Sequence, residues 1–120
     1  MRLLVVDDDP IQLKLAHRQL QLAGYAVVPA SDGKRALAVL RTEPPDVVVS
    51  DVVMSELDGF ALCEAIRADP AIAHVPVLLV TNSSLDASDR MLAKRSGARD
   101  LIVRTPDLGD VIAAIEALRA

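Results

Sequence analysis

The stretch that decides the fold is LLVVDDDP, residues 3–10, in which four apolar residues run into three aspartates and a proline. A short, continuous apolar run of leucine and valine predicts a strand that is buried on both faces of a parallel sheet. Asp9 and Pro10 then predict the start of a helix, because aspartate is a favoured N-cap and proline suits the first helical position. The stretch therefore predicts a buried strand, an acidic turn and a helix in direct succession.

The same alternation of apolar run and helical spacing recurs along the whole chain. Apolar runs predict strands at residues 3–6, 26–28, 47–49, 75–80 and 101–103. Helical spacing of apolar residues predicts helices over residues 10–23, 33–42, 59–68, 87–96 and 108–119. Because parallel strands need crossover helices, this order predicts an α/β fold, a three-layer (βα)5 sandwich around a doubly wound parallel sheet.

Length and composition exclude several classes of protein. The 120 residues suit one domain with one core, and a hydrophobic content of 52% excludes a disordered tail. A formal net charge of −4 argues against direct binding to nucleic acid. The single cysteine, Cys63, excludes a disulfide framework and a cysteine zinc site, and it fits a reducing compartment. No apolar run approaches the roughly 20 residues that span a membrane, so we expect a cytoplasmic protein without a membrane partner.

Polar residues stand at the ends of the predicted strands. They are Asp7, Asp8 and Asp9 after the first strand, Asp51 after the third, Thr81 and Asn82 after the fourth, and Arg104 after the fifth. In a doubly wound sheet, ligands bind beyond the carboxyl ends of the strands. A nucleotide site is excluded there, because phosphate binding needs glycines and free amides after the first strand, and none of the five glycines forms a Gly-x-Gly pair.

Carboxylates that follow the first and third strands would lie on neighbouring strands and repel one another. Such a cluster either raises its pKa values or binds a hard cation. Ligation by a few oxygen atoms, with positions left for water, is what Mg²⁺ prefers. We assign Asp9 the ordinary role of a helix cap, since it directly precedes the first helix. Asp7, Asp8 and Asp51 remain as the candidate site, with a threonine and an arginine from the last two strands converging on them.

On these residues the chain resembles a known family, the receiver (CheY-like) domain of two-component response regulators. The resemblance covers residues 1–120 and rests on an ordered set of motifs: LVVDDDP at 4–10, DVVMSELDG at 51–59, VLLVT at 77–81 and GARDLIVR at 97–104. It implies one receiver domain with the flavodoxin-like strand order 2-1-3-4-5. It leaves open whether the chain is a single-domain regulator or the first domain of a larger protein.

The resemblance also implies a role for each site residue. Asp51 matches the phosphoacceptor, whose carboxylate takes a phosphoryl group from a phosphohistidine on a sensor histidine kinase or a phosphotransfer protein. Mg²⁺, or Mn²⁺, would be held by Asp7, Asp8, Asp51 and the backbone carbonyl of Val53. Thr81 and Arg104 match the residues that bind the phosphoryl group and switch the domain. The resemblance implies a signalling domain rather than an enzyme. Such a domain catalyses at most its own phosphorylation and dephosphorylation.

The sequence departs from the family at several modulating positions. Arg104 replaces a lysine, and its planar guanidinium either pairs with the phosphoryl group or locks onto the aspartates without it. Thr105 stands where the family has a proline after a cis peptide bond. Because a cis bond before a non-proline residue costs about 2.5–4 kcal/mol, we predict a trans Arg104–Thr105 bond. Leu101 replaces an aromatic residue, and Asn82 replaces a small residue beside the threonine.

Val53 and Ser83 occupy the two positions that influence hydrolysis of the acyl phosphate in this family. A valine has no polar atom with which to orient a water molecule, which predicts a long-lived phosphoryl group. The acceptor residues are thus intact, whereas the residues that read out and discharge the phosphoryl group are altered.

Three functions of different classes are compatible with these residues. The favoured one is a phosphoacceptor signalling domain, whose helix 87–96, strand 101–103 and helix 108–119 would contact a second copy or an effector. The alternative is a pseudo-receiver, a protein-interaction domain whose output does not depend on phosphorylation. The third, a Mg²⁺-dependent phosphohydrolase, lacks the second acidic residue that would serve as general acid two positions after Asp51, where Val53 stands.

Overall fold

The computed structural model of the chain describes residues 1–82 and 86–119. Its strands are β1 (Arg2–Val6), β2 (Ala26–Ala30), β3 (Val47–Asp51), β4 (Val77–Thr81) and β5 (Asp100–Val103). Its helices are α1 (Pro10–Leu22), α2 (Gly33–Thr42), α3 (Gly59–Ala68), α4 (Ala87–Ser96) and α5 (Gly109–Arg119). None of the described helices has the length and apolar character of a membrane span. Each strand leads into the next helix, as the repeated apolar runs predict.

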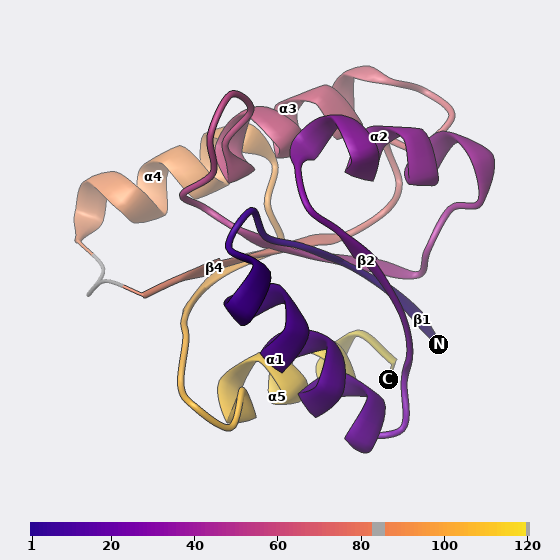
Figure 1. The fold of residues 1–120 in the computed structure, drawn as a ribbon. Coiled ribbons are helices and arrows are strands. Elements are labelled where there is room, and N and C mark those ends of the chain that lie inside the picture. Colours follow the sequence, from indigo (N-terminus) through magenta and orange to yellow (C-terminus); the bar gives the residue numbers. More distant parts are fainter. Residues whose placement is uncertain (83–85, 120) are drawn as a thin grey trace.

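The five strands form one parallel sheet with the order β2-β1-β3-β4-β5, so the predicted fold and strand order are confirmed. The sheet crosses the middle of the molecule, with α1 and α5 on one face and α2, α3 and α4 on the other (Figure 1). β1 pairs with both β2 and β3. The strand order therefore reverses between β1 and β3, at the carboxyl ends of these two neighbouring strands. Doubly wound sheets bind their ligands at this point.

Aspartates cap four of the helices. Asp9 Oδ1 accepts hydrogen bonds from the backbone N–H groups of Ile11 at 2.9 Å and Gln12 at 3.4 Å, which confirms its predicted role. The same role is taken in α2, α3 and α4 by Asp32, Asp58 and Asp86. Each side chain satisfies a donor of the first helical turn that has no partner within the helix. Capping accounts for Asp9, so of the three consecutive aspartates only Asp7 and Asp8 are candidates for the functional site.

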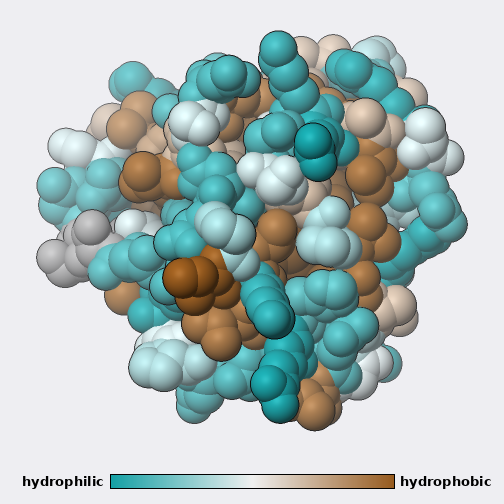
Figure 2. All heavy atoms as spheres, viewed as in Figure 1, coloured by the Kyte–Doolittle hydropathy of each residue, from teal (hydrophilic) through white to brown (hydrophobic). Residues whose placement is uncertain are grey.

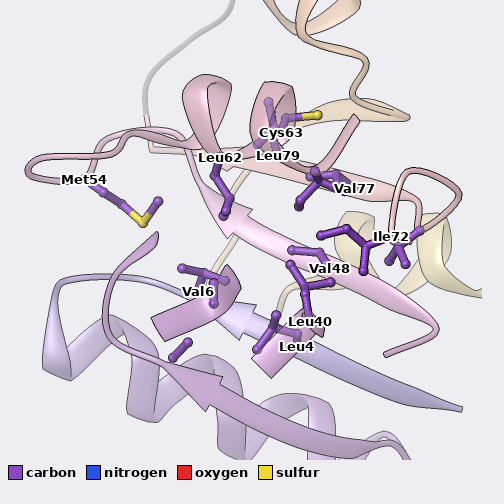
Figure 3. Close-up of a cluster of buried hydrophobic side chains, with 14 of the residues drawn as sticks. Leu4, Val6, Leu40, Val48, Met54, Leu62, Cys63, Ile72, Val77 and Leu79 are labelled. Carbon is purple, nitrogen blue, oxygen red and sulfur yellow. The ribbon is translucent and has the colours of Figure 1, made fainter. Parts of the chain in front are cut away.

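The sheet divides the expected single core into two hydrophobic layers, because strand side chains alternate between its faces. The layer under α1 and α5 includes Leu3, Val5, Leu20, Val47, Val49, Leu78, Val80, Val111 and Ile115. The layer under α2, α3 and α4 includes Leu4, Val6, Leu40, Val48, Leu62, Cys63, Val77 and Leu79 (Figure 3). The thiol of Cys63 is fully buried in this second layer.

The same alternation determines where the acidic side chains emerge. Val5 of β1 pairs with Val49 of β3, and both belong to the layer under α1 and α5. Asp7 and Asp51 stand two positions further along each strand direction, and side chains two residues apart share a face of the sheet. Register and alternation therefore bring Asp7 and Asp51 to the same side of the sheet at its carboxyl edge.

Several observed elements start or end one or two residues away from the predicted bounds, and two of these differences have a clear local cause. The predicted strand 75–80 begins at Val77, because Val75 closes a turn in which its N–H donates to the carbonyl of Ile72 at 3.0 Å. The last helix begins at Gly109 rather than residue 108, because Leu108 has a left-handed φ of 55°. Asp107 Oδ1 accepts a hydrogen bond from the Gly109 N–H at 2.9 Å and thereby starts α5.

Gly59 allows the start of α3 to approach the end of β3. Its N–H donates to the carbonyl of Val52 at 2.9 Å. A Cβ at Gly59 would lie 2.4 Å from the backbone carbonyl oxygen of Asp51 and 2.9 Å from the Cα of Val52. Both separations are well below the 3.5–4.0 Å or so at which non-bonded atoms attract. Backbone atoms have no rotamer to change, so a side chain here must displace the segment that carries Asp51.

We expect Gly59→Ala to lower the free energy of unfolding by about 1–3 kcal/mol, the usual cost of overpacking. Urea denaturation measures this loss. Gly109→Ala is the matched control, because the atom nearest to its added Cβ would be an exposed side-chain atom, Asp107 Oδ1 at 3.1 Å, and not the backbone. That variant should change stability by less than about 0.5 kcal/mol. Equal losses in the two variants would contradict the role given to the close approach at Gly59.

Candidate functional site

Asp7, Asp8 and Asp51 lie at the carboxyl edge of the sheet, where β1 and β3 are neighbours. Asp51 is the last residue of β3, and Asp7 directly follows β1. Asp7 is only 2% exposed and Asp51 only 8% exposed, whereas Asp8 is exposed. Because an unpaired buried carboxylate is costly, the surroundings of Asp7 and Asp51 must supply hydrogen bonds and positive charge.

Backbone amides fix the orientation of all three carboxylates. Asp7 Oδ1 accepts a hydrogen bond at 2.9 Å from an N–H group of its own turn. Asp51 Oδ1 accepts one from the Val53 N–H at 3.2 Å, and Asp8 Oδ2 accepts one from the Ser55 N–H at 2.8 Å. The bond from Ser55 to Asp8 joins the turn after β1 to the segment after β3. These bonds hold the two acidic segments together at the predicted site.

Arg104 supplies the positive charge. Its Nη2 lies 3.2 Å from Asp7 Oδ2 and 3.8 Å from Asp51 Oδ2, and its side chain is only 12% exposed. The backbone N–H of Arg104 donates to the Thr81 carbonyl at 2.7 Å, which anchors the residue beside the end of β4. In the structure the guanidinium is paired with the two aspartates, and its pairing with a phosphoryl group stays a prediction. One cation therefore bridges two buried carboxylates from neighbouring strands.

Gln12 is a site residue that the sequence pattern does not predict. Its Oε1 accepts a hydrogen bond from Arg104 Nη1 at 2.9 Å. Gln12 stands three residues after the N-cap Asp9, where a glutamine commonly bonds back to the backbone of the cap. The position therefore indicates a local capping role, and no sequence signal indicates a partner 92 residues away. Nε of Arg104, in contrast, is buried and finds no hydrogen-bond partner among the described residues.

Burial raises the pKa values of both Asp7 and Asp51. For Asp7, desolvation is the largest cause, and it outweighs the lowering effects of the backbone hydrogen bond and of Arg104. For Asp51, desolvation is again the largest cause and outweighs the Val53 hydrogen bond and Arg104. The negative charges of Asp51 on Asp7, and of Asp8 on Asp51, raise the pKa values further. The guanidinium therefore offsets only part of the buried charge, which suits a further cation.

The donor set at this edge fits a hard divalent cation in its chemistry. Asp7, Asp8 and Asp51 offer carboxylate oxygens, and such oxygens are the ligands that Mg²⁺ prefers. As the side chains lie, no group of three or more His, Cys, Asp or Glu residues within 1–82 and 86–119 is arranged as a metal-ligand set. Arg104 Nη2 lies against the Oδ2 atoms of Asp7 and Asp51 instead. A metal ion at these oxygens would have to share them with the guanidinium or displace it.

The remaining predicted residues lie around this pocket in different surroundings. Thr81 is buried at the end of β4, and the adjacent Asn82 is exposed. Val53 is 73% exposed on the segment that follows Asp51. Leu101 is buried in the hydrophobic layer under α2, α3 and α4. The modulating position Ser83 lies outside the described residues.

Thr105 shapes the segment between β5 and α5. Its hydroxyl donates to Asp107 Oδ1 at 2.9 Å, and its carbonyl accepts from the Leu108 N–H at 3.0 Å. The described residues contain no cis peptide bond, so the predicted trans Arg104–Thr105 bond is confirmed. Thr105 thus ties its own turn together, next to the arginine that reaches the aspartates.

A cavity of about 350 Å³ adjoins the acidic pocket on the far side of Arg104. It lies between α1 and the segment that joins β5 to α5, and it is lined by Gln12, Leu15, Ala16, Gln19, Asn82, Arg104, Thr105, Pro106 and Leu108. Ile11 and Leu15 of α1 are exposed hydrophobic residues, and Figure 2, viewed from the side that carries α1, shows hydrophobic side chains among polar ones on this face. Arg104, Ala16 and Leu108 also line the much smaller cavity beside Asp7 and Asp51, so the two spaces share part of their walls.

Comparison with known proteins agrees with this geometry. Residues 3–116 match the family model of the response regulator receiver domain. Protein PilH of Pseudomonas aeruginosa is 34% identical over 119 residues, which cover 99% of this chain and 98% of PilH. The probable transcriptional regulator ycf27 of Guillardia theta is 37% identical over 117 residues, which cover 98% of this chain and 44% of ycf27. The chain thus spans nearly all of one relative and less than half of another.

A solved structure of the same architecture is the response regulator TrrA of Thermotoga maritima, in complex with Mg²⁺-BeF. It aligns with a TM-score of 0.86 at 26% identity, over 98% of this chain and 97% of that one. The family model covers almost the whole chain, and the strand order and the PilH match agree with it. The chain belongs to the family of response regulator receiver domains of two-component systems, as its motifs predict.

Proposed function

We propose that this receiver domain accepts a phosphoryl group on Asp51 from the phosphohistidine of a sensor histidine kinase or a phosphotransfer protein. The observation that carries the proposal is the buried Asp51 carboxylate at the end of β3, with Asp7 and Arg104 beside it. Asp51 Oδ1 is held by the Val53 N–H, while Oδ2 faces the guanidinium. A fixed carboxylate next to a cation suits the transfer of an anionic group, because position and charge are both prepared.

In the proposed reaction, a carboxylate oxygen of Asp51 forms a bond to phosphorus as the bond from phosphorus to the histidine nitrogen breaks. The electron pair of the broken bond stays on that nitrogen, which leaves as neutral imidazole when the other ring nitrogen carries a proton. The products are an aspartyl phosphate and an unmodified histidine. Negative charge spreads over the outer phosphoryl oxygens during transfer. Arg104, which already lies beside Asp51, is placed to pair with these oxygens.

The proposed metal is Mg²⁺ or Mn²⁺. Its ligands in this proposal are Asp7, Asp8, Asp51 and the backbone carbonyl of Val53. When bound, the ion supplies positive charge that offsets the repulsion between the carboxylate and the phosphoryl group. The raised pKa values of Asp7 and Asp51 support the proposal, since burial penalises the charged carboxylates and a bound cation would offset that penalty. The Mg²⁺-BeF complex of TrrA supports it by likeness of fold.

The proposed role is that of a signalling domain in the cytoplasm, not of an enzyme that turns over a separate substrate. The proposed contact surface for a second copy or an effector comprises α4, β5 and α5. Met91, Leu92 and Val103 on this surface are exposed hydrophobic residues, which suits a protein partner. The net charge of −4 supports a protein partner rather than nucleic acid.

A second candidate function is a pseudo-receiver whose output does not depend on phosphorylation. Two observations favour it. Leu101 packs as an ordinary core residue where the family has an aromatic residue, and Arg104 is engaged by Asp7, Asp51 and Gln12 of the chain itself. The retained acceptor carboxylates favour phosphorylation over this candidate, so the sharper question is how far a phosphoryl signal spreads.

We expect acetyl phosphate with Mg²⁺ to add one phosphoryl group to the protein, since a small acyl phosphate can replace the phosphohistidine as donor. Intact-mass spectrometry should show the adduct on the wild-type protein and not on Asp51→Asn. Removal of divalent cations with EDTA should lower the rate of labelling by at least about tenfold, because a metal ion contributes several kcal/mol to such reactions.

A carboxylate elsewhere provides the control for this labelling. Glu64 is exposed on α3, so Glu64→Gln should be labelled like the wild-type protein. Absence of an adduct on the wild-type protein would favour the pseudo-receiver. Continuous consumption of acetyl phosphate without a stable adduct would favour the phosphohydrolase.

The raised pKa of Asp51 predicts the sign of a pH effect on stability. The folded state binds the Asp51 proton more tightly than the unfolded state, so this group stabilises the fold less as the pH rises through its raised pKa. Asparagine has no charge to bury, so Asp51→Asn should melt at a higher temperature than wild type at pH 7 in EDTA. The difference should vanish at acid pH, where the carboxyl is protonated in both states. Thermal unfolding of both proteins at pH 7 and at acid pH measures this difference in melting temperature. A lower melting temperature for the variant at pH 7 would contradict the prediction.

Beryllofluoride, which mimics a phosphoryl group, tests how far the signal spreads. In an NMR titration with Mg²⁺ present, we expect large shifts around Asp7 and Asp51 and small shifts in α4 and β5. The reason is that Leu101 of β5 is an aliphatic side chain already buried in the core layer, with no aromatic ring to reorient. Large shifts throughout α4 and β5 would show that the usual coupling persists.

A further inference from the structure

Arg104 is held from two sides, and one of its partners has no part in the reaction proposed above. Nη2 contacts the Oδ2 atoms of Asp7 and Asp51, while Nη1 donates to Gln12 Oε1 at 2.9 Å. The guanidinium is a rigid planar fork. A bond that fixes Nη1 therefore also determines where Nη2 lies relative to the carboxylates.

Gln12 is itself fixed by the acidic turn that follows β1. Its backbone N–H donates to Asp9 Oδ1 at 3.4 Å, and the Asp9 N–H donates to Asp7 Oδ1 at 2.9 Å. Pro10 stands at the first helical position, where its fixed φ favours the start of α1. One short turn thus carries both an Asp7 carboxylate and a Gln12 amide, and Arg104 bonds to the two at once.

This arrangement places a cation at the oxygens that a metal ion would use. Nη2 of Arg104 lies against Asp7 and Asp51, and the described side chains include no ready set of metal ligands. Two cations at the same oxygens repel each other, so Mg²⁺ binding works against the hold on the guanidinium. The more firmly the metal-free arrangement is held, the lower the apparent affinity for Mg²⁺ becomes.

Arg104 also has space into which it can shift. It forms part of the wall of the cavity of about 350 Å³ between α1 and the segment after β5. Within the described part of the chain, its buried Nε has no acceptor, so a shift breaks no hydrogen bond at that atom. The bonds that oppose the shift are those of Nη1 to Gln12 and of Nη2 to the carboxylates.

We propose that Gln12 is a positioning residue, which holds Arg104 on Asp7 and Asp51 in the metal-free protein and thereby weakens Mg²⁺ binding. This inference rests on the proposed function for the metal and adds a residue that acts through Arg104. It depends on arginine at this position. A lysine ammonium carries its three donors on one nitrogen, so a bond to Gln12 does not fix a second nitrogen against the carboxylates as the planar guanidinium does.

A double-mutant cycle on Mg²⁺ binding tests the inference. Gln12→Met keeps the length of the side chain and removes the acceptor oxygen. In isothermal titration calorimetry with MgCl₂ alone, we expect Gln12→Met to bind Mg²⁺ about ten- to hundredfold more tightly than wild type, the scale of one hydrogen bond to a charged group. In the Arg104→Lys background, the same substitution should change the affinity for Mg²⁺ by less than about twofold. The reason is that the interaction between Gln12 and Arg104 is already lost when Arg104 is replaced.

Gln19→Met is the matched control. Gln19 lies about two turns further along α1 and lines the same cavity, and the described residues include no hydrogen bond from its side chain to Arg104. Its substitution should leave Mg²⁺ affinity unchanged. The inference is overturned if Gln12→Met leaves the affinity of the Arg104 protein unchanged, or alters it equally in the Arg104→Lys protein.

Arginine side-chain NMR of the metal-free protein provides a readout that needs neither metal nor phosphoryl group. The Nη groups of Arg104 should rotate slowly in the wild-type protein and faster in Gln12→Met, because one fixed bond is lost. Unchanged Arg104 signals would overturn the inference whatever the Mg²⁺ affinities are. Failure of acetyl phosphate to label Asp51 would instead contradict the proposed function, and these spectra would still decide the role of Gln12.

Discussion

The ion pairs of Arg104 with Asp7 and Asp51 are the contacts on which the site depends. The strand order brings the ends of β1 and β3 together, and burial there leaves two carboxylates with little water around them. Neither charge is stable in such a place without a cation. Arg104 follows β5, so the charge balance links the last strand of the sheet to the two strands at which its order reverses. The same unbalanced charge makes the edge suited to a metal ion and a phosphoryl group.

Local patterns in the sequence predicted the strands, the helix cap at Asp9 and the positions of Asp7 and Asp51, because neighbouring residues determine these features. Continuous apolar runs mark the strands because these are buried on both faces, and Asp9 could be assigned as a cap because it directly precedes a helix. Asp7 and Asp51 could be placed because each stands at the end of an apolar run that predicts a strand. The bond between Gln12 and Arg104 could not be predicted, because it spans 92 residues and periodicity does not encode tertiary distances. The capping position of Gln12 even indicated a different, local partner.

The two ends of the site differ in how closely they follow the family pattern. The acceptor end keeps its carboxylates, each oriented by a backbone N–H group. The readout end has a buried Leu101 in one core layer, and a trans peptide bond after Arg104 leads into a turn closed by Thr105 and Asp107. In the proposed function, side chains at the acceptor end serve the chemistry directly, whereas the readout end determines what moves afterwards. A domain altered only at the readout end can retain the chemistry and change the signal.

Locating the phosphoryl group within the chain tests the central claim most directly. After incubation with acetyl phosphate and Mg²⁺, borohydride reduces an aspartyl phosphate to homoserine, and tandem mass spectrometry of the digest identifies the residue that was modified. The account predicts homoserine at position 51 and unmodified aspartates at positions 7 and 8. Modification at Asp7 or Asp8, with Asp51 left intact, would contradict the assignment of the buried β3 carboxylate as the acceptor.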